Sequence, residues 1–387
     1  MRIRDVETFV LKLPADSAYL GRLTDGSEIG PGYQVREPWR SLYSARYETL
    51  LVKVTAEDGT VGWGEALAPV APEVPAQIVD SLLGPVLRGM NATRPRPAWR
   101  ALRDLMRERG HLVGHQADAL AAVDIALWDV AGRIAGLPVA ELLGGAFRTE
   151  IPTYVSGLPR TTDEERAELA RSWVARGAGA VKLHLGHGVD ADVATVRAIH
   201  AAAPSLRIAV DAHWAYSVSD ALRLATRLEA LDVWFLEAPL APEDIDGHAE
   251  LVARTVLPIA VGEALRNRYE FAAWLAARAV RIAQPDVGRT GITELMAIAE
   301  LCAAQHVPVA PHHSVGLGVA LAAGLHVSAA TETFAVFEYQ PTSAEVGQRI
   351  LATPLQIRAD AIPLPVGPGL GVDVDAELVA NLAAKES

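Results

Sequence analysis

From about residue 150 onward, short runs of β-branched and apolar residues alternate with longer segments whose apolar residues recur at helical spacing. In one such segment Thr162 or Asp163 can cap a helix start and Gly177 can end the helix. The alternation is typical of parallel strand–helix units. Strands are predicted at 150–157, 180–186, 207–213, 233–239, 258–263, 281–286, 307–313 and 334–340. The pattern therefore predicts an α/β protein with a barrel of the (β/α)8 type.

The residues before about 125 show a different pattern. VETFVLKL and YETLLVKVTAEDGTVGWGEAL alternate like meander strands joined by a turn at residues 57–59, and residues 74–106 look helical. This part is predicted to be a separate α+β domain. A long helix over 118–136 is expected to pack against the bottom of the barrel. The Pro/Gly-rich segment PLPVGPGLGVDVD near the C-terminus is expected to run back to the first domain.

Composition narrows the possible functions. The chain has 387 residues, half of them apolar, which is ample for a sizeable core. Its net charge of −12, with no Lys/Arg stripe, argues against a nucleic-acid partner. The single Cys302 stands in a helical pattern and is interpreted as a small core residue. No apolar run approaches a membrane span and no signal-like segment is present, so a soluble cytoplasmic protein without a membrane partner is expected.

Three acidic residues end three consecutive predicted strands. Asp211, Glu237 and Glu263 stand at equal intervals of 26 residues. Equivalent positions in repeated strand–helix units lie on one face of a barrel, so the three carboxylates should converge. Converging anions repel one another unless a cation lies between them, and oxygen ligands suit a hard divalent ion such as Mg²⁺. The spacing thus predicts a metal site that stabilises a negatively charged intermediate.

Further polar residues follow the same strands. Lys182 and His184 are two apart on the second strand and should share one side of it, and His213 follows Asp211 by the same step. Polar groups at the carboxyl ends of barrel strands are typical of catalytic residues. All three are therefore candidates for moving protons, although a structural role is the common one for a lone strand histidine.

Asp286 ends the sixth predicted strand and His312 the seventh. A carboxylate that accepts a proton from one imidazole nitrogen fixes the tautomer and raises the basicity of the other, so this pair is the preferred general base. The neighbouring His313 should point away from the pocket. Glu338 ends the eighth strand. It could stay protonated and donate a hydrogen bond to an oxyanion, which is the favoured interpretation, or pair with a Lys or Arg.

A long polar segment between about residues 15 and 45 is interpreted as a lid that screens the reacting site from water, with a solvated loop as the alternative. The candidate substrate contacts in it are Arg22, Arg36, Trp39 and Arg40.

Taken together, these residues resemble the enolase superfamily, mandelate racemase subgroup. The matching motifs cover nearly the whole chain in order and are VGWGE, DIALWD, LLGG, VDAH, EAP, VGE, QPDVGRTGITE, APHHSVGLG, FEYQ and GPGLGVDVD. The resemblance implies a modified TIM barrel, (β/α)7β, with an α+β capping domain formed from both chain ends. The expected division is 1–122 for the capping domain with its lid, 123–354 for the barrel, and 355–387 for the returning segment.

The resemblance also implies Mg²⁺ bound by Asp211, Glu237 and Glu263, and abstraction of the proton α to a substrate carboxylate. Many relatives have Lys-x-Lys on the second strand, where this chain has His184, and Asn two residues after the first ligand, where it has His213. The histidine at the latter position resembles that of acid-sugar dehydratases, in which it is the general acid. The leading hypothesis is therefore dehydration of an aldonate or aldarate to a 2-keto-3-deoxy acid.

Two alternatives stay open. One is a cycloisomerase, epimerase or racemase acting on a sugar acid or lactone through the same enediolate, with Lys182 or His184 returning the proton. The other, remote because every expected site residue is present, is a non-catalytic carbohydrate-binding relative. The general acid could be His213 or His184. The family resemblance also suggests a symmetric homo-oligomer.

Overall fold

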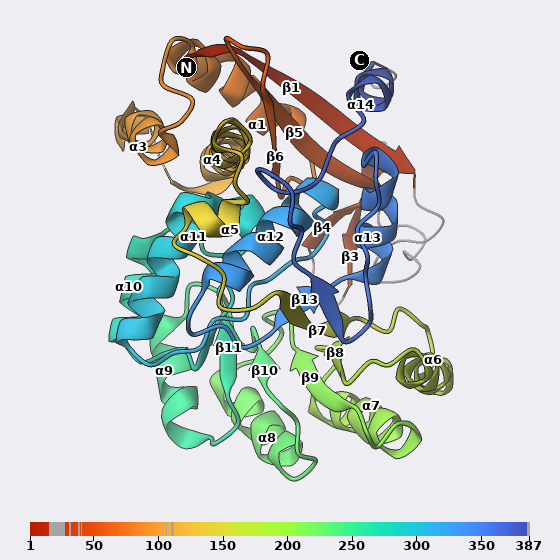
Figure 1. Cartoon of the computed structure of the whole chain (residues 1–387). Helices are drawn as coiled ribbons and strands as arrows, with labels where there is room; N and C mark the ends of the chain where they lie inside the picture. The colour runs from red at the N-terminus through yellow and green to blue at the C-terminus, as the bar shows by residue number, and fades with distance from the viewer. Residues whose placement is uncertain are drawn as a thin grey trace.

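The computed structural model describes residues 1–14, 28–30, 32–37, 39, 41–105, 107–109 and 112–384. A barrel of strands and helices forms one part of the molecule, and an α+β capping part covers one end of it (Figure 1). Both chain termini lie on the capping side of the molecule (Figure 1). The predicted substrate contacts Arg22 and Arg40 fall outside the described residues.

The capping part contains two antiparallel sheets. Strand β5 (Arg46–Ala56) lies between β1 (Ile3–Pro14) and β6 (Val61–Ala66), and the β5–β6 turn falls at residues 57–59, as predicted. The smaller sheet contains β2 (Glu28–Gly30), β3 (Tyr33–Arg36) and β4 (Ser41–Ser44). The remaining elements of this region are α1 (Glu73–Ile78), η1 (Val79–Leu83), α2 (Gly84–Leu87), α3 (Pro95–Leu105), η2 (Arg107–Arg109), α4 (Gly114–Ala135) and α5 (Val139–Leu142).

Helix α4 packs closely on strand β6. A Cβ atom added at Gly64 would lie 1.9 Å from the carbonyl oxygen of Ala122, so only glycine permits this approach. On its other side α4 meets α11 (Val287–Ala304), where Asp124 accepts hydrogen bonds from Thr293. The expectation that this helix lies at the barrel bottom is wrong, because α11 begins at the carboxyl end of a barrel strand and α4 packs near that beginning.

The barrel strands run parallel in the order β12-β11-β10-β9-β8-β7-β13. They are β7 (Glu150–Ser156), β8 (Ala180–His184), β9 (Arg207–Asp211), β10 (Leu236–Glu237), β11 (Ile259–Val261), β12 (Ile282–Ala283) and β13 (Phe337–Tyr339). The seventh predicted strand, 307–313, is fully described and forms only isolated bridges, from Val309 to both neighbours and from His312 to Asp286. Pro308 and Pro311 lack the N–H groups that a regular ladder needs. Single bridges therefore close the ring at this position.

A layer of buried side chains fills the barrel interior. Its members come from successive strands and are Tyr154, Ala180, Ala209, Phe235, Ala260, Ile282, Ala310 and Val336. The many alanines leave room for the two large aromatic rings, so this level of the barrel is a packed core rather than a channel. The polar residues at the strand ends lie beyond this layer.

Helices surround the barrel and link it to the cap. The helices that follow the barrel strands are α6 (Asp163–Ala175), α7 (Val189–Ala202), α8 (Val218–Glu229), α9 (Ile245–Arg254), α10 (Arg268–Ala276), α11 and α12 (Gly318–Ala330). They are followed by α13 (Pro341–Gly347), η3 (Gln348–Ile350), β14 (Ala361–Pro363) and α14 (Ala376–Ala383). Strand β14 pairs with β7, and α14 packs on β1, so the C-terminal segment returns to the cap. Within the described ranges, no helix has the length and apolar character needed to cross a bilayer.

Candidate active site

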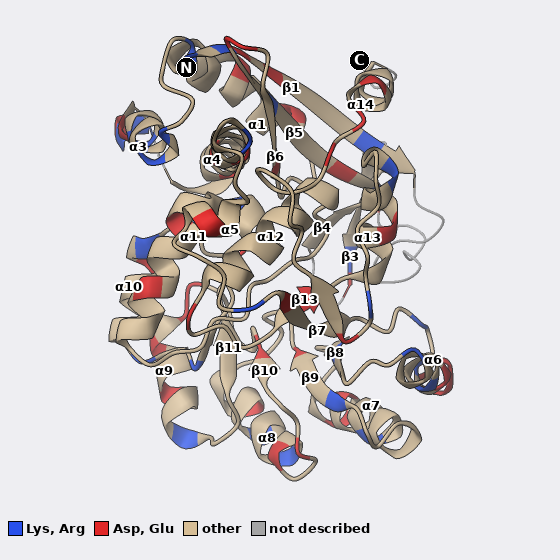
Figure 2. Ribbon diagram, viewed as in Figure 1, with Lys and Arg blue, Asp and Glu red and all other residues tan. Residues whose placement is uncertain are grey.

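The three predicted metal ligands lie at neighbouring strand ends. Asp211 is the last residue of β9, Glu237 is the last of β10, and the two are direct partners in the parallel register. Glu263 follows β11 by two residues. Figure 2 shows charged residues spread over the outer helices and acidic residues on the central strands. Asp211 and Glu237 are almost fully buried.

The carboxylate of Glu237 accepts hydrogen bonds from one cationic group and one amide group. Lys182 Nζ donates to both of its carboxylate oxygens at 2.9 Å, and Gln284 Nε2 donates to Oε2 at 2.7 Å. Burial raises the pKa of Glu237, and the carboxylates of Asp211 and Glu338 raise it further, against the opposing charge of Lys182. Glu237 is therefore a carboxylate whose negative charge is unfavourable unless a cation is near.

Glu338 shares the same lysine. Its Oε1 lies 2.8 Å from Lys182 Nζ and accepts a hydrogen bond from Ser156 Oγ at 2.5 Å. Burial opposes ionisation, but Lys182 and His312 hold the pKa of Glu338 at about 2. The structure thus supports the ion-pair alternative for Glu338. The favoured interpretation, a protonated carboxyl that donates to an oxyanion, does not fit, because Lys182 stabilises the charged form.

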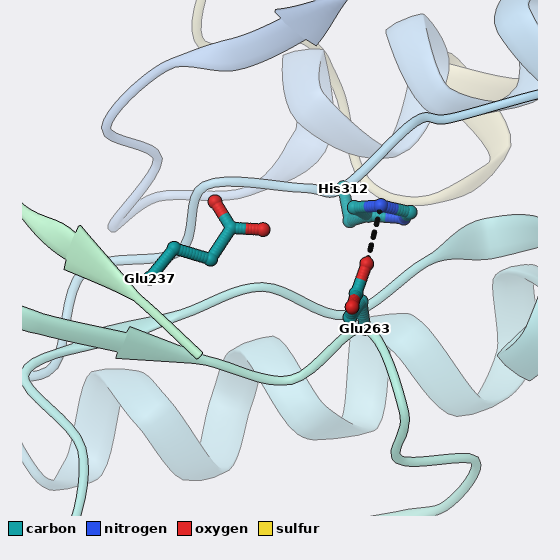
Figure 3. Close-up of side chains that lie close together, drawn as sticks. All are labelled: Glu237, Glu263 and His312. Carbon is teal, nitrogen blue, oxygen red and sulfur yellow. Dashed lines mark ion pairs between the residues drawn. The ribbon is translucent and has the colours of Figure 1, made fainter. Parts of the chain in front are cut away.

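His312 lies between two carboxylates. Its Nδ1 is 2.6 Å from Asp286 Oδ2, and its Nε2 is 2.9 Å from Glu263 Oε2, the contact drawn in Figure 3. The other oxygen of Asp286 accepts from the backbone N–H of Gly288 and so caps α11. Burial opposes protonation, but Glu338 and Glu263 together raise the pKa of His312 well above its usual value. The predicted Asp286–His312 contact is therefore present; its role as a base remains a prediction.

A divalent cation fits the chemistry of this site. The described residues that could share a metal within 4.8 Å are Glu237, Glu263 and His312, and Asp211 is not among them. Asp211 instead accepts from the backbone N–H of His213. Glu263 Oε1 is buried and has no hydrogen-bond partner among the described residues. The charged groups that pair with one another here are the acids Asp211, Glu237, Glu263, Asp286 and Glu338 and the bases Lys182, His213 and His312. His184 also lies 3.7 Å from Asp211, but burial lowers its pKa to about 4, so it adds no positive charge near pH 7. Even with all three bases charged, two negative charges remain uncompensated, which suits a divalent ion with oxygen ligands.

His213 reaches the site through an unusual backbone rather than through strand alternation. Its φ is 48°, in the left-handed region, and it lies two residues beyond the end of β9 at Asp211. Its Nε2 lies 3.0 Å from the Tyr43 hydroxyl, and its ring lies 4.7 Å from the Trp39 ring. Burial lowers the pKa of His213, but the Asp211 carboxylate more than offsets this, so the pKa is raised. His213 is thus an ion-paired imidazole covered by the capping part.

His184 lies 3.7 Å from the same Asp211 carboxylate, but the rest of its environment differs. It lines a second cavity with Arg36, Trp39 and His187, and burial lowers its pKa to about 4. Arg36 and Trp39 are the two predicted lid contacts that lie among the described residues, and both border this cavity. The Arg36 guanidinium lies 5.8 Å from the centre of the Trp39 ring. A neutral His184 lacks the proton that a general acid must deliver near pH 7.

His213 and His312 line one cavity of about 230 Å³ between cap and barrel. The charged and polar residues around it include Tyr43, Arg46, Glu48, Glu263, Arg289 and Ser314. This volume is below the range of about 300–1,000 Å³ that is usual for drug-sized ligands, as expected for a small metabolite. His313 lies outside the cavity: its buried ring stacks on Phe337 at 5.6 Å, as its predicted orientation requires.

The sequence did not reveal four of these residues. Ser156 is the direct register partner of Lys182, and Gln284 stands two residues before Asp286, so strand alternation could have indicated both. Tyr43 and Arg289 face the site only because the cap and α11 bring them there. No spacing rule in the sequence links either residue to His213 or His312.

Two family models match the chain. Residues 37–144 match the mandelate racemase/muconate lactonizing enzyme N-terminal domain, and residues 165–378 match the enolase C-terminal domain-like family. The second match alone spans more than half of the chain. The chain belongs to the mandelate racemase/muconate lactonizing enzyme family of the enolase superfamily. The fold inferred from the resemblance is thereby confirmed.

Individual members of the family are also similar over most of their length. The D-galactarolactone cycloisomerase of Agrobacterium fabrum is 32% identical, over 86% of this chain and 90% of the relative. The D-galactonate dehydratase of Verminephrobacter eiseniae is 34% identical, over 85% and 90%. A solved enolase-superfamily structure from Agrobacterium tumefaciens superimposes with a TM-score of 0.93 at 39% identity, covering 98% of each chain.

Proposed function

We propose that this protein is a Mg²⁺-dependent enzyme that removes the proton α to a carboxylate, and that its reaction is the dehydration of an acid sugar to a 2-keto-3-deoxy acid. The observation that carries the proposal is that His312 and His213 line one small cavity together with Glu263. A base and an acid are thus available to a single bound ligand. A non-catalytic binder would need neither.

Asp211, Glu237 and Glu263 would hold the Mg²⁺ ion, with Asp211 turned from its contact with the His213 N–H toward the other two carboxylates. When bound, the ion supplies positive charge that stabilises the carboxylate dianion formed after proton loss. Bound there, it would also compensate the excess negative charge of these carboxylates. Lys182 stays paired with Glu237 and Glu338 and fixes the position of both carboxylates.

His312 accepts the α proton. Asp286, 2.6 Å from Nδ1, holds the ring in the orientation that leaves Nε2 as the reacting nitrogen. Nε2 lies 2.9 Å from Glu263 in this structure, and the carboxylates of Glu263 and Glu338 favour its protonated form. With a cation held by Glu263, that charge would be compensated and Nε2 left as the neutral base that takes a proton from the ligand. The C–H bond breaks, and its electron pair moves into the carboxylate to form the enediolate.

His213 is the proposed general acid. As the enediolate collapses, the bond from the β carbon to its hydroxyl oxygen breaks, and the proton of His213 completes the departing water. The product enol then tautomerises to the keto acid. Asp211 stabilises the protonated imidazole from 3.7 Å. His184 lies on a different cavity and lacks this access.

The relationship to D-galactarolactone cycloisomerase favours a second candidate, opening of a sugar lactone through the same enediolate. There the leaving group is the ring carboxylate. The conjugate acid of a carboxylate has a pKa of about 4, whereas water, the conjugate acid of hydroxide, has a pKa of about 15.7. The ring carboxylate can therefore leave without being protonated, whereas a hydroxide cannot. The two reactions therefore differ in their need for His213.

The decisive experiment is His213→Asn, measured with open-chain acids and with lactones. For a dehydratase we expect loss of water elimination by about 10²–10⁴-fold, with solvent deuterium exchange at the α carbon retained. Dehydration at the wild-type rate would exclude His213 as the acid. Lactone opening by wild type that survives His213→Asn would support the cycloisomerase instead.

His184→Asn is the matched comparison, because it removes the other imidazole that lies 3.7 Å from Asp211 but lines the second cavity. If His213 is the acid, His184→Asn should lose much less dehydration than His213→Asn. Absence of α-proton exchange with every acid sugar and lactone tested would reject both enzymatic proposals. The homo-oligomer and the cytoplasmic location remain predictions from the sequence alone.

A further inference from the structure

Arg289 lies on the wall of the cavity that contains His213 and His312. It belongs to the first turn of α11, three residues after Asp286, and the loop at Leu67 lies alongside, with its N–H donating to Gly288 O at 2.8 Å. Helix α11 is broken just beyond, at Gly291, where φ is 74°. The turn that carries Arg289 is therefore positioned by the cap and by the Asp286–His312 pair. Just beyond it, α11 packs on α4, where the N–H of Thr293 donates to Asp124.

The guanidinium of Arg289 is not used within the described part of the chain. Its Nε is buried without a hydrogen-bond partner, and none of its nitrogens makes a hydrogen bond or ion pair with the described residues. Asp118 is the acid that its charge influences, but Asp118 pairs with Arg266 at 3.4 Å. Asp118 thus pairs with Arg266, and the Arg289 guanidinium has no ion-pair partner among the described residues.

The other arginine on the cavity wall is different. Arg46 lies 4.0 Å from the buried carboxylate of Glu48. Among the residues that the structure describes, Arg289 has no such counter-ion. A partly buried guanidinium offers five N–H donors and loses favourable solvation when they are unsatisfied. Planar carboxylates are the ligands that pair with this group in two parallel hydrogen bonds.

We infer that Arg289 binds a second carboxylate of the substrate, at the end remote from the carbon that loses its proton. This deepens the proposed function, on which it rests, by naming the substrate class as an aldarate, an acid sugar with a carboxylate at each end, rather than a monocarboxylic aldonate. The acidic and metal-binding end of the cavity takes one carboxylate, and Arg289 takes the other. Arg289 is then a specificity-determining residue.

The test is binding, which does not depend on turnover. Full-length protein with Mg²⁺ is titrated calorimetrically with each aldarate of a stereoisomer panel and with the aldonate of the same configuration. We expect at least one aldarate to bind about 10-fold to 100-fold more tightly than its aldonate, the range for a charge-assisted pair. Arg289→Gln should abolish this preference, and Arg289→Lys should restore part of it.

Arg254→Gln, an exposed arginine at the end of α9, is the matched control for loss of one positive charge and should keep the preference. The inference fails if wild type prefers no aldarate over its aldonate, or if Arg289→Gln keeps the preference. Should Arg289→Gln unfold, Arg289→Lys with a reduced preference still supports the inference, and an unchanged preference contradicts it. Failure of the proposed function would appear separately, as loss of α-proton exchange in wild type.

Discussion

Buried carboxylates occur in two regions of this molecule, and their surroundings are opposite. At the junction of cap and barrel, Glu65 accepts hydrogen bonds from the backbone N–H groups of Leu317 and Ala320, both at 2.7 Å, and from Thr49 Oγ1 at 3.0 Å. Asp129 likewise accepts from Trp63 N–H at 2.8 Å. Each of these acids is surrounded by donors from the chain itself.

At the barrel mouth the acids face one another instead. Asp211 and Glu237 are register partners, and Glu237 depends on Lys182, which Glu338 shares. The difference teaches how to distinguish a structural acid from a functional one. A buried carboxylate with enough N–H donors stabilises the fold, whereas a group of carboxylates with too few cations requires a ligand that the chain does not provide.

The largest effect should come from the acids at the mouth. Glu237→Gln should reduce α-proton exchange by at least about 10³-fold, because the enediolate loses its counter-charge. The midpoint of thermal unfolding should stay unchanged or rise, since a repelling charge is removed. Activity should also vanish after exhaustive EDTA treatment and return with Mg²⁺. Full activity without metal would contradict the assignment of this region as functional.

Asp286 is both a structural and a functional acid, because it caps α11 and orients His312. Asp286→Asn tests which of these two roles matters more. We expect α-proton exchange to fall by about 10–100-fold, since the imidazole loses its orienting carboxylate while Asn can still cap the helix. Stopped-flow or NMR exchange rates with an acid sugar provide the measurement. A loss of stability without a change in the exchange rate would make Asp286 purely structural.

Glu65→Ala should have the opposite effect to Glu237→Gln, with stability lowered and α-proton exchange retained. Two buried backbone N–H groups lose their acceptor, which should lower the free energy of unfolding by about 2–4 kcal/mol. The folded fraction should keep its exchange rate within about threefold. Urea unfolding of Glu65→Ala beside Glu65→Gln, which keeps one acceptor oxygen, measures this. A larger loss of activity than of stability would remove Glu65 from the structural group.

The smallest effect concerns buried histidines, which differ between the regions in the same way. Burial lowers the pKa of His326 to about 4, whereas the carboxylates around His312 raise its pKa. A histidine in the unfolded chain has a pKa of about 6.5, so between pH 6.5 and pH 4 the unfolded state binds a proton that folded His326 does not. The free energy of unfolding therefore decreases as pH falls through this range.

His326→Asn keeps an acceptor for the Ala140 N–H group. It should reduce the slope of unfolding free energy against pH in that window by about 1.4 kcal/mol per pH unit. Denaturant midpoints at several pH values give the slope. Parallel pH profiles for wild type and variant would contradict a neutral buried His326.

The sequence by itself determined the family, the barrel, the capping domain and the acids at the strand ends. It could do so because strand–helix alternation has a fixed period and because parallel strands bring equivalent positions to one face. The equal spacing of Asp211, Glu237 and Glu263 and the pairing of Asp286 with His312 follow from that rule alone. The alternation rule does not predict every strand in full. The seventh predicted strand contains Pro308 and Pro311 and forms only single bridges to its neighbours.

Only the tertiary structure decided which groups neutralise these acids and which side chains share a cavity. Lys182 pairs with both Glu237 and Glu338, which makes Glu338 an ionised partner rather than a protonated donor. His213 reaches the cavity through a left-handed backbone, and Arg289 through a turn held by the cap. The physical reason is that charge compensation depends on distances of a few ångströms between segments remote in sequence, and no local period of the chain encodes them.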